Sequence, residues 1–583
     1  MSGGSKRQER FLFGAVVLGA VMALGAMAGM MHARTAALSP ARTAAAAEPY
    51  DIVITGGRVL DGTGNPWFSA DVGIRDGRIA AIGDLCGPSS AGCPARRKLD
   101  ASGLYVAPGF IDLLGQSEIT VLVDNRAESK IRQGITSEIT GEGESVAPQN
   151  EKTLPEVQEG VAPFGIQVDW RTLSQYFARF ERQGSAINLG TNVGAAQVRK
   201  AVLGSANRAP SPAELDQMRR LVAEAMQQGA VGISSALIYA PGTYAKTDEL
   251  IELAKVAARY GGIYSTHMRS EGKGIFTALD EAFRIGREAG LPVHIYHLKV
   301  SGAAMWGKMG EVIARIEKAR AGGLEVTANM YAYRAGANGL SANLPSWALE
   351  GGTDKAIERL RDPVTRAKIK AAMAGRFSDA DAHGVLINAV ANEKLRGLEG
   401  KRLDEIARER GNDPMDVMFD ILIEDRMQTG QIVFMMAEPD IERAFAEPWV
   451  AFGCDYGAVR PDGILGRDRA HPRAYGNFPR LLGRYTRDLH LLPLEQTIRK
   501  MTSLPAQIMR IEDRGMLRPG MWADVTLFDY ARIRDLATFE DPNQYSEGIR
   551  YVIVNGQLVL DDGKMTDARP GRPIRGRAWT GSN

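Results

Sequence analysis

The stretch LYVAPGFIDLLGQSE, residues 104–118, contains the pattern that decides the fold. An apolar run reaches Asp112, and the chain then turns away with Leu114 and Gln116 just beyond the run. A short buried run that ends in a polar residue is typical of a barrel strand, because the functional side chains of such barrels sit at the carboxyl ends of the strands. We therefore interpret residues 108–112 as the end of a first barrel strand.

Further short apolar runs follow, and helical stretches such as PAELDQMRRLVAEAMQQG and TDELIELAKVAARYGG lie between several of them. The runs are AINLGTNVG (186–194), AVGISSALIYA (230–240), GGIYSTHMR (261–269), LPVHIYHLK (291–299), LEVTANMYAY (324–333) and WVAFGCD (449–455). This alternation predicts a parallel α/β array. About eight such units over roughly 400 residues fit a (β/α)8 TIM-like barrel with insertions.

Both ends of the chain have a different pattern. YDIVITGGRVLDGTG and ADVGIRDGRIAAIG near the start, and ADVTLFDY and YVIVNGQLVLDDGK near the end, are short alternating runs broken by Gly and Asp-Gly turns, which predicts hairpins. We expect one small β-sandwich built from residues 49–106 and 516–575. The barrel then spans 107–515 with an insertion near 338–400, and 576–583 form a tail.

The first 48 residues predict an export segment and a linker. A basic start, SKRQER, precedes the uncharged run Phe11–Met31, whose 21 residues are enough to span a bilayer. The run is rich in Ala and Gly, and ARTAAAAEP offers small residues for cleavage. We expect an exported chain, either periplasmic or anchored to the membrane by residues 11–31. Since 71 Lys and Arg balance 69 Asp and Glu, nothing indicates a nucleic-acid surface.

The cysteines agree with export. Cys86 and Cys93 bracket one loop and can pair in an oxidising compartment, although two free loop thiols are the alternative. Cys454 is separate and lies beside Asp455.

Histidines and carboxylates gather at the predicted strand ends. His267 and His297 end two successive strands, Asp455 ends a later one, and Glu142 and Glu144 follow ITSEIT. A single histidine at a strand end is usually structural, but two on successive strands with a later aspartate favour a metal site. Imidazole and carboxylate are ligands that Zn²⁺ accepts.

The remaining histidines are less suited to such a site. Side chains alternate along a strand, so a spacing of three places His294 on the face opposite to His297, toward the helices. His297 is nearer the strand end and shares its face with Lys299. His383 and His490 have no comparable context, and we interpret them as surface or structural residues.

Several motifs together carry a resemblance. In order they are YDIVITGGRVLDGTG, PGFID, GISSALIYAPGTYA, THMRSEG, HLKVSG, AHPRAYGNFPRLLGRY and MTSLPAQ. As a set they resemble the N-acyl-D-amino-acid deacylases (D-aminoacylases) of the amidohydrolase superfamily, over roughly residues 50–575. The resemblance implies a bent barrel with a β-sandwich and one or two zinc ions at the barrel mouth.

The resemblance also implies roles for individual residues. His267 matches the ligand on strand five, His297 the ligand on strand six and Asp455 the acid on strand eight. Where these enzymes have a ligand cysteine in a GNCG-like stretch, this chain has GEGE, which offers Glu142 or, with a gap of one residue, Glu144. Some related deacetylases use a carboxylate at this position.

Leu114 and Gln116 stand where the family usually has His-x-His. Leucine cannot bind a metal and a glutamine amide is a poor zinc ligand, so the second metal position is lost. The family is thought to use that position weakly or not at all. We therefore expect one ion, zinc or another divalent metal, held by Glu142, His267 and His297 with a fourth position open, which is the pattern of a catalytic zinc site.

The expected reaction is hydrolysis of an amide C–N bond other than a peptide bond, with Asp455 as general base and then acid. The resemblance places Lys299, Tyr331 and Arg473 around the carboxylate of a small N-acyl amino acid, and Arg suits a bidentate grip. Ala337 replaces a serine that is common in the family. Hydrolysis of a cyclic amide or dipeptide, or an exported relative that binds without catalysis, are the alternatives. Acyl group, stereochemical preference and oligomeric state stay open.

Overall fold

The computed structural model describes residues 48–87, 93–374, 377 and 379–581. The export segment predicted at residues 11–31 lies outside this part of the chain. Among the described residues, no helix combines the length and the apolar character that crossing a bilayer requires.

Eight parallel strand segments form the barrel. They are β8 (Phe110–Asp112), β9 (Ile135–Thr140), β10 (Asn188–Thr191) continued by β11 (Val193–Gly194), β12 (Gly232–Ala236), β13 (Ile263–His267), β14 (Val293–Ile295), β15 (Val326–Met330) and β19 (Val450–Phe452). Neighbouring strands pair in parallel, from β8 through to β19. The ring closes where the Leu113 amide donates to the Phe452 carbonyl (3.4 Å) and Gly115 bridges Tyr456. The predicted (β/α)8 barrel is confirmed.

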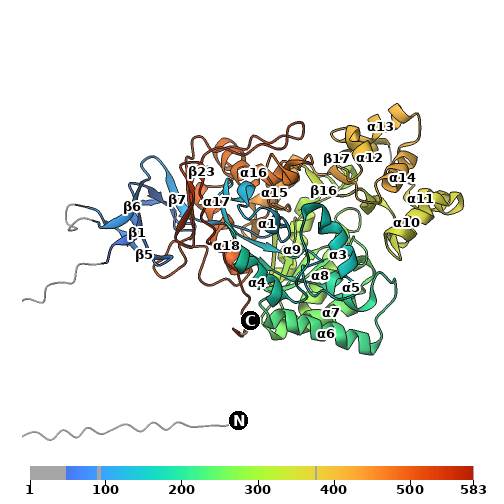
Figure 1. Ribbon diagram of the computed structural model, residues 1–583, viewed down its shortest axis with the longest axis horizontal. Coiled ribbons are helices and arrows are strands. Elements are labelled where there is room, and N and C mark those ends of the chain that lie inside the picture. The colour runs from blue at the N-terminus through green and yellow to red at the C-terminus, as the bar shows by residue number, and fades with distance from the viewer. Residues whose placement is uncertain (1–47, 88–92, 375–376, 378, 582–583) are drawn as a thin grey trace, which may run out of the picture. The chain divides into compact units, whose positions relative to one another are not determined.

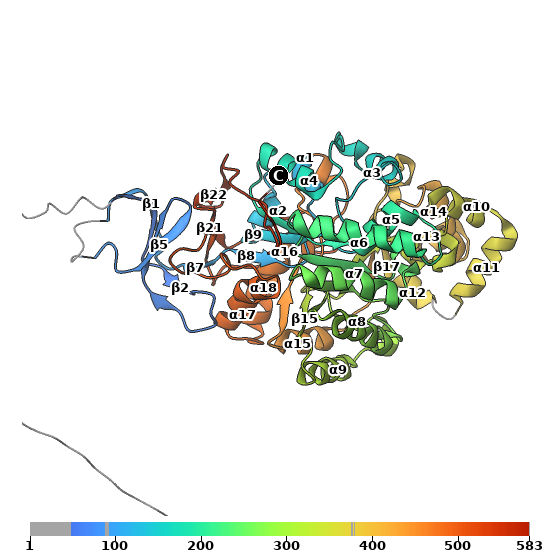
Figure 2. The same cartoon turned by 90° about the horizontal axis from the view of Figure 1, so that it is seen from below.

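Helices cover the outside of these strands, and α5 to α9 lie one against the next around them (Figures 1 and 2). The helices of the barrel are α1 (Thr120–Val123), α2 (Glu128–Ile131), α3 (Leu154–Val161), α4 (Leu173–Gln183), α5 (Ala195–Leu203), α6 (Pro212–Gln227), α7 (Thr247–Arg259), α8 (Ile275–Ala289), α9 (Met309–Ala321), α15 (Glu438–Ala446), α16 (Arg473–Arg480), α17 (Leu494–Met501) and α18 (Ser503–Ile508). Helix α6 begins at a capping box between Ser211 and Glu214. Helix α7 buries Leu250, Leu253 and Ala257, the helical spacing that turns one face to the strands.

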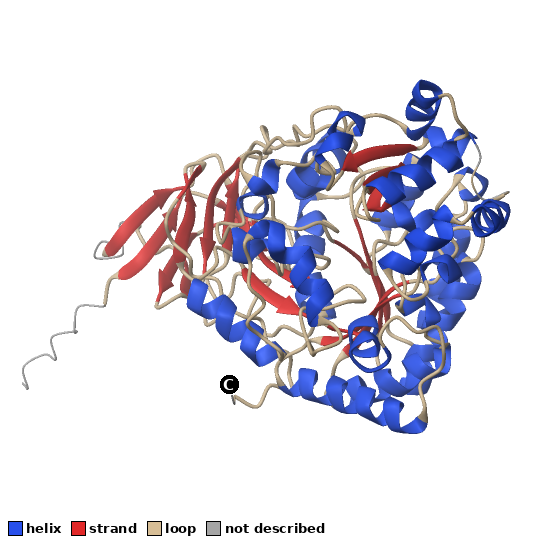
Figure 3. Ribbon diagram, turned by 45° about the vertical axis from the view of Figure 1, so that its right-hand side comes forward, coloured by secondary structure: helices blue, strands red, loops and turns tan. Residues whose placement is uncertain are grey.

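Two sheets form the β-sandwich (Figure 3). The four-stranded sheet is made of β1 (Tyr50–Thr55), β4 (Asp71–Arg75), β5 (Arg78–Gly83) and β6 (Ala95–Asp100). The seven-stranded sheet is made of β2 (Arg58–Val59), β3 (Phe68–Ser69), β7 (Tyr105–Pro108), β20 (Val525–Phe528), β21 (Ile549–Val554), β22 (Gln557–Asp561) and β23 (Lys564–Met565). Strand β20 pairs with β7, and Val72 and Ile553 share one apolar core, so both ends of the chain build this domain as predicted.

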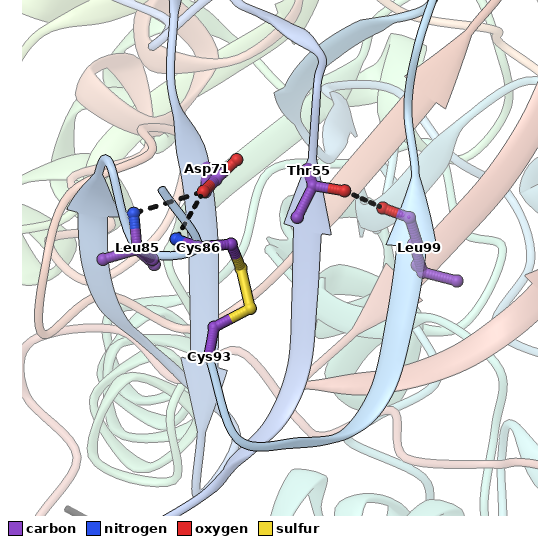
Figure 4. Close-up of a disulfide and its surroundings, with 6 residues drawn as sticks. All are labelled: Thr55, Asp71, Leu85, Cys86, Cys93 and Leu99. Atoms are coloured by element: carbon purple, nitrogen blue, oxygen red, sulfur yellow. Dashed lines mark hydrogen bonds between the residues drawn. A yellow bond between two sulfur atoms is a disulfide. The ribbon is translucent and has the colours of Figure 1, made fainter. Parts of the chain in front are cut away.

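One disulfide lies in the connection between β5 and β6 of the four-stranded sheet. Cys86 is bonded to Cys93, which is the first of the two alternatives that the sequence left open (Figure 4). The carboxylate of Asp71 accepts hydrogen bonds from the backbone amides of Leu85 (3.2 Å) and Cys86 (3.0 Å), which holds the start of this loop against β4. Cys454 is buried and unbonded.

A separate lobe follows β15. Its sheet is made of β16 (Ala335–Gly339), β18 (Gly430–Phe434) and β17 (Val385–Ala389), and its helices are α10 (Thr353–Arg361), α11 (Pro363–Met373), α12 (Asp379–His383), α13 (Leu403–Arg410) and α14 (Pro414–Glu424). These elements share an apolar core of their own, which includes Leu360, Ile387 and Phe419. The insertion predicted near 338–400 lies within this longer segment, which we call the insertion lobe (residues 335–434).

Candidate metal centre

Three side chains converge at the carboxyl ends of the barrel strands. Glu142 follows β9, His267 is the last residue of β13, and His297 lies two residues beyond β14. Glu142 Oε1 is 2.8 Å from His267 Nδ1 and 3.0 Å from His297 Nε2, and the two nitrogens are 3.0 Å apart. Both histidines are buried. The set of one carboxylate oxygen and two imidazole nitrogens is of the kind that binds a divalent metal ion.

Local backbone geometry explains the position of Glu142. Gly141 and Gly143 on either side have φ values of 85° and 73°, which side chains rarely tolerate. A Cβ on Gly143 would lie 2.6 Å from the backbone nitrogen of Ala236, and the Gly143 amide donates to Ser234 Oγ (3.1 Å). The GEGE motif is therefore a tight turn that presents Glu142 to the histidines.

The position of His297 is fixed by its backbone conformation and by hydrogen bonds. Its φ of 34° is left-handed, and its backbone amide donates to Asn329 Oδ1 on β15 (2.7 Å). On the far side of the ring, His297 Nδ1 is 2.9 Å from Glu271 Oε1. Burial and the nearby Lys299 ammonium disfavour the charged imidazole, but the Glu271 and Glu142 carboxylates outweigh them and raise the pKa of His297 to about 9.

The electrostatics of Glu142 follow from the same contacts. Burial alone would raise the pKa of its carboxyl, but the hydrogen bonds and charges of His267 and His297 hold that pKa well below its ordinary range. Glu142 is therefore a carboxylate, and its ligand oxygen lies within 4.8 Å of the ligand nitrogens of His267 and His297. Once the imidazoles release their protons all three atoms are acceptors, and one divalent cation between them satisfies all three, so these residues fit a bound divalent ion.

The second predicted carboxylate, Glu144, lies elsewhere. Its side chain is 49% exposed and pairs with Lys200 (2.8 Å). Of the two alternatives in GEGE, Glu142 is therefore the one that the fold brings to His267 and His297.

Asp455 stands beside the three residues, three positions after the end of β19. Its Oδ2 is 2.9 Å from an Arg473 NH2 group, and its Oδ1 accepts from the Gln116 side-chain amide (3.0 Å). Burial raises the pKa of Asp455 although the Arg473 guanidinium acts against this. The same amide nitrogen of Gln116 lies 3.1 Å from Glu142 Oε2.

The residues expected to hold a substrate carboxylate cluster around one aromatic ring. Tyr331 lies 4.3 Å from the Arg473 guanidinium and 5.8 Å from Lys299 Nζ, measured to its ring centre. Arg473 is 1% exposed, and its Nε and NH1 groups make no hydrogen bond within the described part of the chain. Lys299 Nζ instead donates to Glu271 Oε1 (2.6 Å) and lies 2.6 Å from His297 Nδ1.

Sequence reasoning missed Glu271. This carboxylate contacts His297 and Lys299 and lies 3.8 Å from His267 Nε2. Burial would raise its pKa, but the charges of Lys299, His267 and His297 lower it instead. A carboxylate four residues after His267 in THMRSEG was the available signal.

The prediction for His294 was wrong. In the parallel register His294 pairs with Ser265, and Ser265 shares a strand face with His267. His294 therefore faces the barrel interior, where its ring contacts Thr327 Oγ1 (2.9 Å) and Asn329 Nδ2 (3.1 Å). Burial lowers its pKa to about 3, so it is neutral. The alternation argument failed because the left-handed backbone at His297 breaks the extended geometry.

Glu142, His267, His297 and Asp455 line a cavity of about 710 Å³. The barrel supplies its floor, including Gln116, Tyr239 and Tyr331, and the insertion lobe supplies a wall that includes Asn338 and Gln431. A pocket at the carboxyl ends of barrel strands is where enzymes of this fold bind their substrates.

Comparisons with known proteins show which family has this sequence. The profile of the "Amidohydrolase family" matches residues 97–560. A D-aminoacylase from Alcaligenes xylosoxydans xylosoxydans is 36% identical over 528 residues, which cover 90% of this chain and 98% of that protein. The chain belongs to the amidohydrolase family.

Two solved structures share this amidohydrolase fold. One is a D-aminoacylase that is 36% identical with a TM-score of 0.75, and the match covers 90% of this chain and 100% of the other. That D-aminoacylase has a binuclear metal centre, in which one metal activates the enzyme and the second attenuates it. The other is an N-acyl-D-glutamate deacylase from Bordetella bronchiseptica in complex with zinc and a phosphonate inhibitor that mimics the tetrahedral intermediate. It is 34% identical with a TM-score of 0.76, covering 91% and 100%. The resemblance to D-aminoacylases is confirmed.

Proposed function

We propose that this protein is a metal-dependent hydrolase that removes the acyl group from small N-acyl-D-amino acids, with zinc as the metal. The observation that carries the proposal is the convergence of Glu142, His267 and His297 beside Asp455. The chain that holds this set is 36% identical to a D-aminoacylase over nearly its whole length.

Glu142 Oε1, His267 Nδ1 and His297 Nε2 are the atoms that would hold the ion. When bound, a divalent ion polarises an amide carbonyl and makes water a stronger acid. Glu271 has a supporting role, because its contact with His297 Nδ1 fixes the ring so that Nε2 faces the ion position.

Asp455 is the proposed proton carrier. Its carboxylate takes a proton from the attacking water and returns it to the departing nitrogen. The raised pKa of Asp455 suits the first step, because a carboxylate with a higher pKa is a stronger base and takes the proton of the water more readily. Arg473 and Gln116 hold the two carboxylate oxygens in fixed directions.

Arg473, Tyr331 and Lys299 are the proposed partners of the substrate carboxylate. Arg473 has two buried N–H groups without a partner in the described chain, and a carboxylate would satisfy them. Tyr331 and Lys299 line the cavity directly. Since Lys299 is already paired with Glu271, it contributes less free charge than Arg473.

We further propose that the enzyme acts outside the cytoplasm, exported by residues 11–31 and then periplasmic or anchored to the membrane by them. The disulfide between Cys86 and Cys93 supports this, because such bonds persist in oxidising compartments.

An activity screen with three substrates tests the function. Purified protein, loaded with zinc, is given N-acetyl-D-methionine, its L-enantiomer and a six-membered cyclic amide at equal concentration. We expect release of acetate from the D-substrate, with Asp455→Asn as the inactive control. Hydrolysis of the cyclic amide alone, or of none of the three, would overturn the proposal.

A further inference from the structure

Gln116 lies between the two carboxylates of the site. Its side-chain NH2 group donates to Glu142 Oε2 (3.1 Å) and to Asp455 Oδ1 (3.0 Å). The two oxygens of Glu142 therefore have different partners. Oε2 accepts from Gln116, and Oε1 contacts His267 and His297. The backbone of Gln116 is fixed in turn, since its amide donates to the Tyr456 carbonyl (3.3 Å).

Two neighbouring carboxylates need something positive between them. Either a cation or a group with two N–H donors can supply this, and a primary amide has both donors on one nitrogen. That nitrogen has no lone pair to offer a metal, so a position occupied by it is closed to an ion. Leu114, the other residue at this strand end, is buried and apolar and adds no donor atom.

We propose that the side-chain amide of Gln116 takes the place of a second metal ion. It bridges Glu142 and Asp455, keeps the centre mononuclear, and makes the enzyme insensitive to excess metal. Gln116 is thus a positioning residue, because it acts through Asp455. The part of the inference that concerns turnover rests on the proposed function, while the part that concerns ion number does not.

Elemental analysis of variants tests the ion number without any substrate. Native protein and Gln116→Glu are dialysed against excess zinc, then gel-filtered and analysed. In Gln116→Glu a third carboxylate faces Glu142 and Asp455, so we expect two ions per chain against one for the native protein. Gln116→Leu, which has a similar volume but neither donor nor ligand, is the matched control and should hold one. Gln116→His supplies an imidazole in place of the acid and should also hold two.

Kinetics test the positioning role. Native activity should stay level as zinc rises, whereas activity of Gln116→Glu should fall. Gln116→Leu should lose on the order of tenfold in kcat with KM unchanged, because Asp455 loses one charge-assisted hydrogen bond.

Two ions in the native protein, or one ion in both Gln116→Glu and Gln116→His, would overturn the inference. Unchanged kcat in Gln116→Leu would remove the positioning role. If the ion numbers are as expected but N-acyl-D-amino acids are not hydrolysed, the proposed function fails and the assignment of Gln116 stands.

Discussion

A single oxygen atom, Glu142 Oε1, is the point toward which both imidazoles of the site turn. At the scale of residues, the centre depends on which atoms the backbone presents. Glu142 and Glu144 are only two positions apart. Because Gly141 and Gly143 are left-handed, the side chain of Glu142 points to the histidines, whereas that of Glu144 pairs with Lys200.

The pair of glutamates gives a matched test. Glu142→Gln should lose most of its bound zinc, because a neutral amide replaces the anionic ligand. Glu144→Gln changes the same charge two residues away and should keep one ion per chain. The measurement is zinc content after dialysis against a weak chelator. Equal loss in both variants would contradict the assignment of Glu142.

A variant of Asp455 distinguishes a role in catalysis from a role in metal binding. Asp455→Asn should retain the ion and lose about 10²–10⁴-fold in kcat, since an amide cannot accept the proton. His267→Ala and His297→Ala should lose the ion as well as the activity. Zinc content and turnover are measured on the same samples. An Asp455→Asn protein without metal would show that Asp455 is a ligand.

At the scale of elements, the insertion lobe decides what the cavity wall offers. A chain of hydrogen bonds runs from Asn343 Nδ2 to Gln431 Oε1 (3.0 Å), from Gln431 Nε2 to Asn338 Oδ1 (2.9 Å) and from Asn338 Nδ2 to the Tyr239 hydroxyl (3.3 Å). Asn338 lies on β16 and Gln431 on β18. The wall is therefore polar but uncharged.

Arg269 and Lys299, the two cations among the described residues that line the cavity, are already engaged, and Arg473 is assigned to the α-carboxylate of the substrate. Arg269 donates to Glu281 and to the Thr243 and Ala245 carbonyls, and Lys299 donates to Glu271. A second carboxylate on the substrate would be left without a partner, which disfavours binding.

We therefore expect N-acetyl-D-methionine to be cleaved with at least about tenfold higher kcat/KM than N-acetyl-D-glutamate. Gln431→Arg should narrow that ratio by adding a cation to the wall, and Gln431→Met, which adds none, is the control. A native preference for the glutamate substrate would contradict this account of the wall.

The elements also explain which parts of the site were predictable. His267 ends a strand, and His297 and Asp455 follow within three residues of a strand end, so local pattern was enough to find them. The wall was not predictable, because β16 and β18 pair Asn338 with Gln431 across a long separation in sequence. His294 was misplaced because the rule of alternation assumes an extended backbone that His297 does not have.

At the scale of the whole molecule, the two ends of the chain meet in one sheet, where β7 pairs with β20. This closure was predictable because both ends carry the same hairpin pattern. The disulfide belongs to the same domain, whereas Cys454 is buried beside the site and burial raises the pKa of its thiol.

Thiol counting follows from this arrangement. Protein recovered without reductant and denatured in a thiol reagent should show one free thiol, and three after reduction. Native protein should react slowly, because Cys454 is buried and protonated. Three free thiols before reduction would contradict both the disulfide and the proposed export.

Metal titration of the stripped enzyme tests the central claim most directly. Protein treated with a chelator and then dialysed is given zinc in steps, and deacylation of N-acetyl-D-methionine is followed at each step. A centre held by Glu142, His267 and His297 predicts no activity without metal, a linear rise, and a plateau at one equivalent per chain. Full activity in the stripped protein, or a rise that continues to two equivalents, would contradict the account.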